Sequence, residues 1–217
     1  MLVRECMTRD PITVAPNTPV PVALRLMREK KVRRLPVLDS HGKLAGIVSD
    51  KDLLYASPSP ATTLAVWEIP DLLAKIKVET VMARDVISVS EDTPLEEAAR
   101  IMVDNRIGGL PVMQAQTLVG IITETDLFKV LLQLLGGRRP GVRVTATIPG
   151  VKGTLAKIAA AIFGAGGDIV GLGLSEAVED NGNQWGKLTV KVQDVSPDTL
   201  VEAIRPVVTE ILDVREM

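Results

Sequence analysis

The chain has 217 residues, of which 46% are hydrophobic and 2% are aromatic, and it carries a formal net charge of −2. This length allows one to three small domains, and their cores must be aliphatic because aromatic residues are so few. The small charge gives no general attraction to nucleic acid or to an anionic membrane, so neither is expected as a partner.

Cys6 is the only cysteine, which excludes an intramolecular disulfide and indicates a reducing compartment. No apolar run approaches the roughly 18–20 residues that are needed to span a bilayer. The N-terminal stretch MLVRECMTRD is too polar for a signal peptide. We therefore expect a cytoplasmic protein.

The sequence contains an internal repeat. The segment from Met7 to Leu53 returns between Met82 and Leu127, with its characteristic residues in the same order. Two small units of one design normally pack on each other and form two equivalent clefts. Clefts of that kind suit a ligand sensor better than a catalyst.

Each repeat is expected to contain a strand, a helix, two strands and a second helix. In the first repeat these are a strand at Ile12–Val14, a helix with Thr18 as N-cap and Pro19 at its first position, strands at Leu35–Leu38 and Leu44–Val48, and a helix that opens at Ser49. In the second repeat they are Ile87–Val89, a helix from Thr93 and Pro94, strands at Leu110–Met113 and Leu118–Ile122, and a helix that opens at Thr123. Glu96 is expected to complete a capping box with Thr93.

Turn-forming residues mark the expected domain boundaries. Ser57-Pro58-Ser59-Pro60 is one break, and Gly136-Gly137-Arg138-Arg139-Pro140 is the second. A helix between Leu64 and Ile76 is expected in the first linker, limited by Pro70. We divide the chain into a first repeat (1–56), a linker with an inserted helix (57–79), a second repeat (80–135), a linker (136–141) and a C-terminal domain (142–217).

The C-terminal domain is predicted to have the order βαββαβ, which is a ferredoxin-like pattern. The expected elements are a strand at Val142–Ile148, a helix carrying Leu155, Ile158 and Ile162, strands at Ile169–Leu174 and Leu188–Val192, a helix capped by Ser196 and shortened by Pro206, and a final strand in the tail ILDVREM. The overall fold class is therefore α/β (α+β).

The sharpest local pattern is Gly-Ile-Val-Ser49-Asp-Lys-Asp52, which returns as Gly-Ile-Ile-Thr123-Glu-Thr-Asp126. Ser/Thr-x-x-Asp at a helix start resembles a capping box, and a capping box requires no ligand. A helix N-terminus with a hydroxyl also suits a phosphate, and a carboxylate one turn later suits the two hydroxyls of a ribose. The occurrence of the pattern in both repeats favours ligand binding.

These features resemble a pair of CBS domains, a Bateman module, over about Met1 to Leu135. The resemblance is carried by the DPITV and DVISV starts, the Leu-Pro-Val strands and the two endings described above. It implies a regulatory module that binds adenosine-containing ligands such as AMP, ADP, ATP or S-adenosylmethionine, with no catalytic cofactor.

Carried over from that family, each cleft takes its hydroxyl and aspartate from one repeat and its other residues from the second repeat. The first cleft would consist of Thr123, Asp126, Ile12, Arg33, Arg34 and Pro36, and the second of Ser49, Lys51, Asp52, Ile87, Gly108, Gly109 and Pro111. We expect the first cleft to bind more tightly because arginine grips phosphate bidentately, whereas Lys51 is the only cation expected near the second. The alternative for Arg33 and Arg34 is a solvated helix end.

The C-terminal domain resembles an ACT domain through Gly153-Thr154-Leu155-Ala156 and Gly167-Asp168-Ile169. That resemblance implies dimerisation and an amino-acid site, with Lys152, Gly153, Thr154 and Asp168 as candidates. The chain departs from the family pattern at Gly150, Lys152 and Asp168, so a purely dimerising role is equally open. A CBS pair followed by an ACT domain is similar to the acetoin-utilisation AcuB-type proteins of bacteria.

Catalysis and metal binding find little support in the sequence. His41 lies in a polar turn, Cys6 has no histidine near it, and no P-loop, GxSxG motif or metal-spaced Cys/His set is present. We expect a homodimeric sensor that is not an enzyme and that signals to a protein partner. Leu188, Val190 and Val192 form an apolar face that needs cover. The domain's own two helices can cover one face of the sheet but not both faces and the edges, so the C-terminal domain is expected to contribute to the dimer. The alternative is a dimeric interaction scaffold with vestigial clefts.

Overall fold

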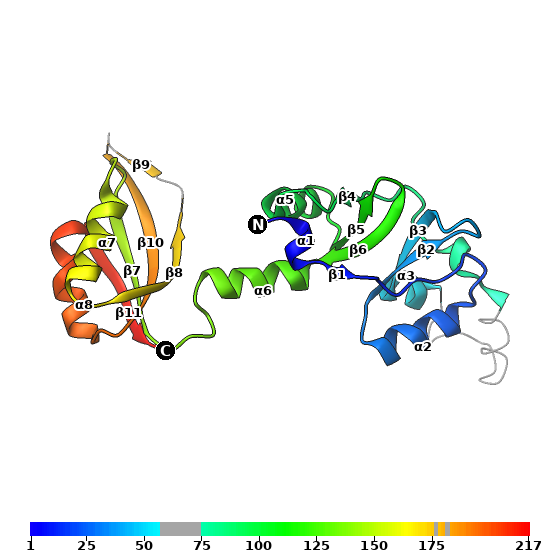
Figure 1. Ribbon diagram of the computed structural model, residues 1–217, viewed down its shortest axis with the longest axis horizontal. Helices are drawn as coiled ribbons and strands as arrows, with labels where there is room; N and C mark the ends of the chain where they lie inside the picture. Colours follow the sequence, from blue (N-terminus) through cyan, green and yellow to red (C-terminus); the bar gives the residue numbers. More distant parts are fainter. Residues whose placement is uncertain (57–74, 176–177, 181–182) are drawn as a thin grey trace. The chain divides into compact units, whose positions relative to one another are not determined.

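The computed structural model describes residues 1–56, 75–175, 178–180 and 183–217. Nearly all of the expected helix from Leu64 to Ile76, and the Ser-Pro break before it, lie outside the described residues. The chain forms two compact units, Met1–Leu127 and Phe128–Met217. Helices and sheets alternate along it, which confirms the expected α/β class (Figure 1).

The first unit holds the two repeats. The first repeat contributes α1 (Val3–Cys6), β1 (Thr8–Arg9), α2 (Val20–Lys30), β2 (Arg34–Leu38), β3 (Leu44–Ser49) and α3 (Asp50–Tyr55). The second contributes a 3₁₀ turn (Val78–Thr80), β4 (Val89–Ser90), α5 (Leu95–Asp104), β5 (Gly109–Gln114), β6 (Thr117–Thr123) and α6 (Glu124–Leu134), which continues past the boundary of the unit. The two hairpins and the helices that follow them are as predicted. The strand expected at Ile12–Val14 is reduced to a single bridge between Val14 and Val37.

The start of each repeat pairs with the last strand of the other repeat. β1 lies antiparallel to β6, with Thr8 opposite Ile121 and Arg9 opposite Gly120. In the same way, Ala83 at the start of the second repeat forms a bridge with Ile47 on β3. The repeats therefore exchange their first residues.

This exchange corrects the predicted helix starts. The N-caps of α2 and α5 are Pro19 and Pro94, and neither helix has a side-chain cap, so the box expected between Thr93 and Glu96 does not form. The exchanged backbone takes the place of the cap. Val20 N donates to Ile76 O at 3.0 Å, and Leu95 N donates to Met1 O at 3.1 Å, which satisfies a helix-end N–H that would otherwise need a side chain.

Glycine makes this pairing possible at one position in each hairpin. A Cβ on Gly46 would stand 2.6 Å from Met82 Sδ and 2.8 Å from Ala83 O, and a Cβ on Gly120 would stand 2.5 Å from Met7 Sδ. The buried core of the first repeat accordingly contains Val78 and Met82 from the second.

The C-terminal unit has the predicted ferredoxin-like order. Its elements after α6 are β7 (Val142–Pro149), α7 (Thr154–Gly164), β8 (Asp168–Leu174), β9 (Val178–Asp180), β10 (Asn183–Gln193), α8 (Pro197–Ile204), a 3₁₀ turn (Arg205–Val207) and β11 (Glu210–Glu216). The antiparallel strands lie in the order β11-β7-β10-β8, and β9 pairs with the end of β10. Pro206 lies in the 3₁₀ turn that ends α8, as expected.

The apolar face of this sheet is covered by the chain itself. Leu188, Val190 and Val192 pack in one core with residues of α7 and α8, and both helices lie on the same face of the sheet (Figure 1). The two helices therefore provide the cover that this face was expected to need, and the expected dimer remains a prediction. On the opposite face the backbone of Leu135 and Gly136 lies directly against Gly171.

Gly46→Ala should destabilise the first unit by about 1–3 kcal/mol, because the new methyl group collides with the backbone carbonyl of Ala83. Gly186→Ala is a matched control in a strand, since the nearest atom to its Cβ lies at 3.5 Å. Urea unfolding followed by circular dichroism measures both. An unchanged first-unit transition in Gly46→Ala would show that the close approach of the exchanged segment is not required.

Candidate functional site

The two repeated turns form the same hydrogen bonds. At the junction of β3 and α3, Ser49 donates to Asp52 Oδ2 from its Oγ at 2.7 Å and from its backbone N at 2.8 Å. At the junction of β6 and α6, Thr123 donates to Asp126 Oδ2 from its Oγ1 at 2.7 Å and from its backbone N at 3.1 Å. Asp126 is buried and Asp52 is half-buried. The capping arrangement is therefore present, and it sets one hydroxyl and one carboxylate at each helix start.

A cleft of about 460 Å³ lies between the two repeats. It contains Ser49, Lys51 and Asp52 from the first repeat and the backbone of Gly108 and Gly109 from the second, as the sequence predicted. Two other residues expected there do not line it: Pro111 is buried within β5, and Ile87 is 39% exposed.

The arginines are not divided between the clefts as expected. Arg33 and Arg34 both line the cleft of Ser49 and Asp52, for which the sequence predicted Lys51 as the only basic residue. The guanidinium of Arg34 lies directly over Gly108, where a side chain on residue 108 would collide with it. Arg33 Nη2 lies 3.4 Å from Thr125 Oγ1, at the start of α6.

Sequence reasoning missed three charged residues of this cleft, Asp50, Arg106 and Glu124. Arg106 follows α5 with φ 54°, and Lys31 follows α2 with φ 55°. The alignment of the repeats would have drawn attention to this matched position. Glu124 N donates to Gly108 O at 3.2 Å, which places the first residue of α6 beside the second-repeat wall of the cleft.

The residues expected around Thr123 and Asp126 are arranged by the first repeat. Val14 N donates to Pro36 O at 3.1 Å, so the segment that contains Ile12 runs beside β2. Ile12 is half-buried against the core and Pro36 is buried. Arg33 is the candidate that reaches the first turn of α6.

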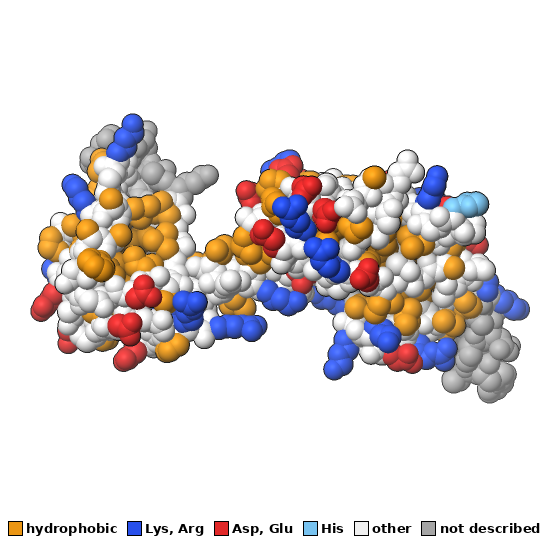
Figure 2. All heavy atoms as spheres, viewed as in Figure 1, with side chains coloured by type: hydrophobic (Ala, Val, Ile, Leu, Met, Phe, Trp, Pro, Cys, Tyr) orange, Lys and Arg blue, Asp and Glu red, His pale blue; other side chains and the backbone are white. Residues whose placement is uncertain are grey.

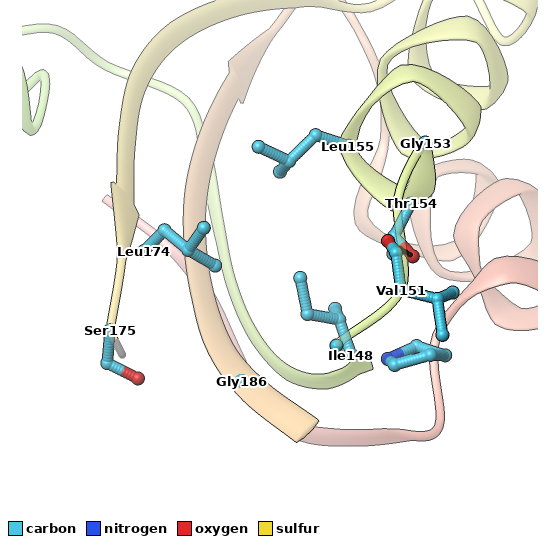
Figure 3. A pocket seen from close by; sticks show the side chains of 10 residues that line it. Ile148, Val151, Gly153, Thr154, Leu155, Leu174, Ser175 and Gly186 are labelled. Carbon is cyan, nitrogen blue, oxygen red and sulfur yellow. Dashed lines mark hydrogen bonds between the residues drawn. The ribbon is translucent and has the colours of Figure 1, made fainter. Parts of the chain in front are cut away.

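The C-terminal unit has a separate pocket of about 290 Å³ where β7 leads into α7. Leu155 from α7 and Leu174 from β8 point into it from opposite sides (Figure 3). None of the described residues that line this pocket is charged. Gly153 and Thr154 belong to the lining, whereas Lys152 does not. Asp168 follows the C-terminal end of α7, whereas the pocket lies at its N-terminal end. The helix between them has 11 residues and is about 16 Å long.

The reactive side chains named from the sequence lie outside these sites. Burial raises the pKa of the Cys6 thiol, which disfavours the thiolate. His41 is exposed, and its backbone N donates to Asp39 Oδ1 at 2.8 Å. The bond from Lys43 N to the same carboxylate lowers the pKa of Asp39. Among the described residues, no cluster suits a metal ion and no helix is long and apolar enough to cross a membrane.

Comparison with known proteins gives a consistent result. The CBS domain model matches residues 3–59 and 78–133. The crystal structure of a candidate acetoin utilization protein (AcuB) from Vibrio cholerae is 35% identical, with a TM-score of 0.52 over 64% of this chain and 95% of that one. CBSX2 from Arabidopsis thaliana in complex with AMP is 35% identical, with a TM-score of 0.50 over 61% of this chain and 96% of that one. The CBS domain pair of protein MJ0100, in complex with 5-methylthioadenosine and S-adenosyl-L-methionine, is 28% identical, with a TM-score of 0.52 over 64% and 98%.

Ser49 should act as a helix cap independently of any ligand. Ser49→Ala should lower the free energy of unfolding by about 0.5–2 kcal/mol, whereas Ser49→Gly should lower it by only a few tenths, because glycine is tolerated at an N-cap. Ser40→Ala, in an exposed turn, is the control. Equal unfolding midpoints for Ser49→Ala and the control would contradict the cap. Ser49→Gly then removes the hydroxyl for binding studies with little cost in stability.

Proposed function

The chain belongs to the CBS-domain family, and we propose that it is a regulatory protein that binds adenosine nucleotides between its two CBS repeats. One observation carries the proposal: the cleft brings the Ser49–Asp52 hydroxyl–carboxylate turn of one repeat together with the Gly108-Gly109 segment of the other. The complexes of CBSX2 with AMP and of MJ0100 with S-adenosyl-L-methionine support this class of ligand.

The chemistry of the cleft fits the parts of a nucleotide. The start of α3 brings the Ser49 hydroxyl and the Lys51 side chain to the cleft, and a hydroxyl beside a basic side chain suits a phosphate. Asp52 suits the hydroxyls of a ribose. Thr123 and Asp126 offer the same pair of groups at the start of α6, so we propose a second, related site there.

Binding would act on the arrangement of the repeats. A ligand that touches both repeats binds one relative arrangement more tightly and shifts the population toward it. Glu124 begins α6 in the cleft, and α6 continues into the C-terminal unit. This helix is the path by which we propose that the ligand state reaches a partner or a dimer mate. The likeness to AcuB from Vibrio cholerae supports a bacterial role in acetoin utilisation, and we propose that this role is cytoplasmic and does not involve catalysis.

A dimeric scaffold is the second candidate, favoured by the edge of the C-terminal sheet. β8 is the last strand in that sheet, and its Leu172 and Leu174 are 40% and 50% exposed. Figure 2 shows hydrophobic side chains gathered in the region of β8 and β10. We propose an ACT-like domain that pairs with a second copy at this edge, because an exposed apolar edge strand tends to be paired or covered. None of the described residues that line the pocket beside Gly153 has a charged side chain that would pair with the charges of an amino acid, which favours dimerisation over amino-acid binding.

Calorimetry on the full chain should detect binding of at least one of AMP, ADP, ATP and S-adenosylmethionine. Asp52→Asn should weaken that binding about tenfold or more, because a charge-assisted hydrogen bond contributes roughly 1.5–3 kcal/mol. Asp39→Asn, in an exposed turn outside the cleft, should bind as the wild type does. If none of the four ligands binds, the sensor role is lost and the scaffold remains.

Light scattering on the full chain should give a dimer at micromolar concentration. Leu172→Glu combined with Leu174→Glu should produce a monomer, because two charges would be buried at the β8 edge. Phe163→Glu, at an 82% exposed position on α7, is the control and should leave the dimer intact. A monomeric wild type would sink the proposal, and a dimer that survives the double substitution would place the interface elsewhere.

A further inference from the structure

Arg34 crosses from one repeat to the other. Its backbone pairs with Ser49 in the β2–β3 hairpin, while its guanidinium lies over Gly108 at the end of the second repeat's wall. Gly109 leaves space for the aliphatic part of the Arg34 side chain, since a Cβ on residue 109 would stand 3.2 Å from Arg34 Cδ. The two glycines of the second repeat thus make room for an arginine of the first.

Glu124 approaches the same point from the opposite side. A Cβ on Gly108 would meet Glu124 Oε2 at 2.6 Å as well as the Arg34 guanidinium, so a cation and an anion converge over one glycine. Glu124 is exposed, and its backbone is fixed by the bond from its N to Gly108 O. A carboxylate is therefore present where the guanidinium would meet a phosphate.

We infer that Arg34 and Glu124 make the Ser49/Asp52 cleft selective for adenosine di- and triphosphates, with Glu124 occupying the phosphate position until a phosphoryl group displaces it. This inference rests on the proposed function and reverses the expected ranking of the two clefts. A terminal phosphate carries more charge than a carboxylate and has three acceptor oxygens, so it competes for Arg34 where an uncharged ligand does not.

The remaining charges of the cleft favour a chain of phosphates over a single one. The cleft has four basic side chains, Arg33, Arg34, Lys51 and Arg106, and three acidic ones, Asp50, Asp52 and Glu124. Basic side chains are therefore available to more than one phosphoryl group of ADP or ATP. In the related turn of the second repeat, Thr125 stands at the position of Lys51. The larger share of phosphate-binding charge therefore lies with Ser49 and Asp52. Because Glu124 is the first residue of α6, its displacement would act on the helix that leads to the C-terminal unit.

The test compares adenosine, AMP and ADP by calorimetry on the full chain. In the wild type, affinity should rise with phosphate number. Arg34→Ala should weaken ADP about tenfold or more and leave adenosine within twofold. Gly108→Ala should also weaken ADP, but less than Arg34→Ala does, because its methyl group displaces both the guanidinium and the competing Glu124 carboxylate. Gly164→Ala, with no atom within 4 Å of its Cβ, is the control and should bind as the wild type does.

Glu124→Gln is the decisive variant, because it should raise the affinity for ADP, and a variant that fails to fold cannot bind ADP more tightly. It should tighten ADP roughly fourfold or more, as expected when one negative charge is removed at about 5 Å in solvent. Glu96→Gln, an exposed glutamate on α5, changes the net charge equally and should have no effect. Unchanged or weaker ADP binding in Glu124→Gln overturns the inference, as does equal affinity for adenosine and ADP. If no adenosine compound binds at all, the proposed function fails as well.

Discussion

The exchange of first segments between the repeats is the constraint on which the rest of the first unit depends. Neither repeat completes its own structure: the first N–H of α2 is bonded to Ile76 O, just before the second repeat, and the first N–H of α5 is bonded to Met1 O, at the start of the first. Val78 and Met82 lie in the core of the first repeat although they belong to the second in sequence. Because each half supplies a backbone cap and core residues to the other, the two strand-to-helix turns are held in a fixed relation. A cleft with walls from both repeats follows from that relation.

The capping and binding roles of the repeated turns are compatible. Ser49 and Asp52 bond each other and the backbone of the turn, which fixes their side chains at a helix N-terminus. A site that is rigid before the ligand arrives loses less entropy on binding. The capping box that requires no ligand is thus also the feature that holds a hydroxyl and a carboxylate in place for one.

The sequence predicted the elements and failed where a distant residue decides the outcome. Alternating and helical apolar patterns placed the hairpins and the C-terminal βαββαβ order, because those patterns reflect local burial. Thr18 and Thr93 have good capping chemistry, and yet an exchanged carbonyl provides the bond, which no local rule contains. The family resemblance places Arg34, which precedes Leu35-Pro36, in the cleft of Thr123 and Asp126, whereas its guanidinium lies where Gly108 leaves room. How far a side chain extends across the interface between the repeats depends on which positions of the other repeat have no side chain.

That absence explains why two similar repeats need not be equivalent. The aligned positions hold Arg33-Arg34 in one repeat and Gly108-Gly109 in the other. A second pair of arginines at the glycine positions would bring four guanidinium groups to one interface, where like charges repel. Replacing Arg33 and Arg34 with glycine as well would leave Lys51 and Arg106 as the remaining basic residues among those that line the described cleft. Arginines in one repeat opposite glycines in the other therefore allow the two repeats to pack together. The same arrangement places the Arg34 guanidinium over Gly108, in the cleft of Ser49 and Asp52. Asymmetry in the residues that face each other is the basis on which we propose that this duplicated fold has two sites with different preferences.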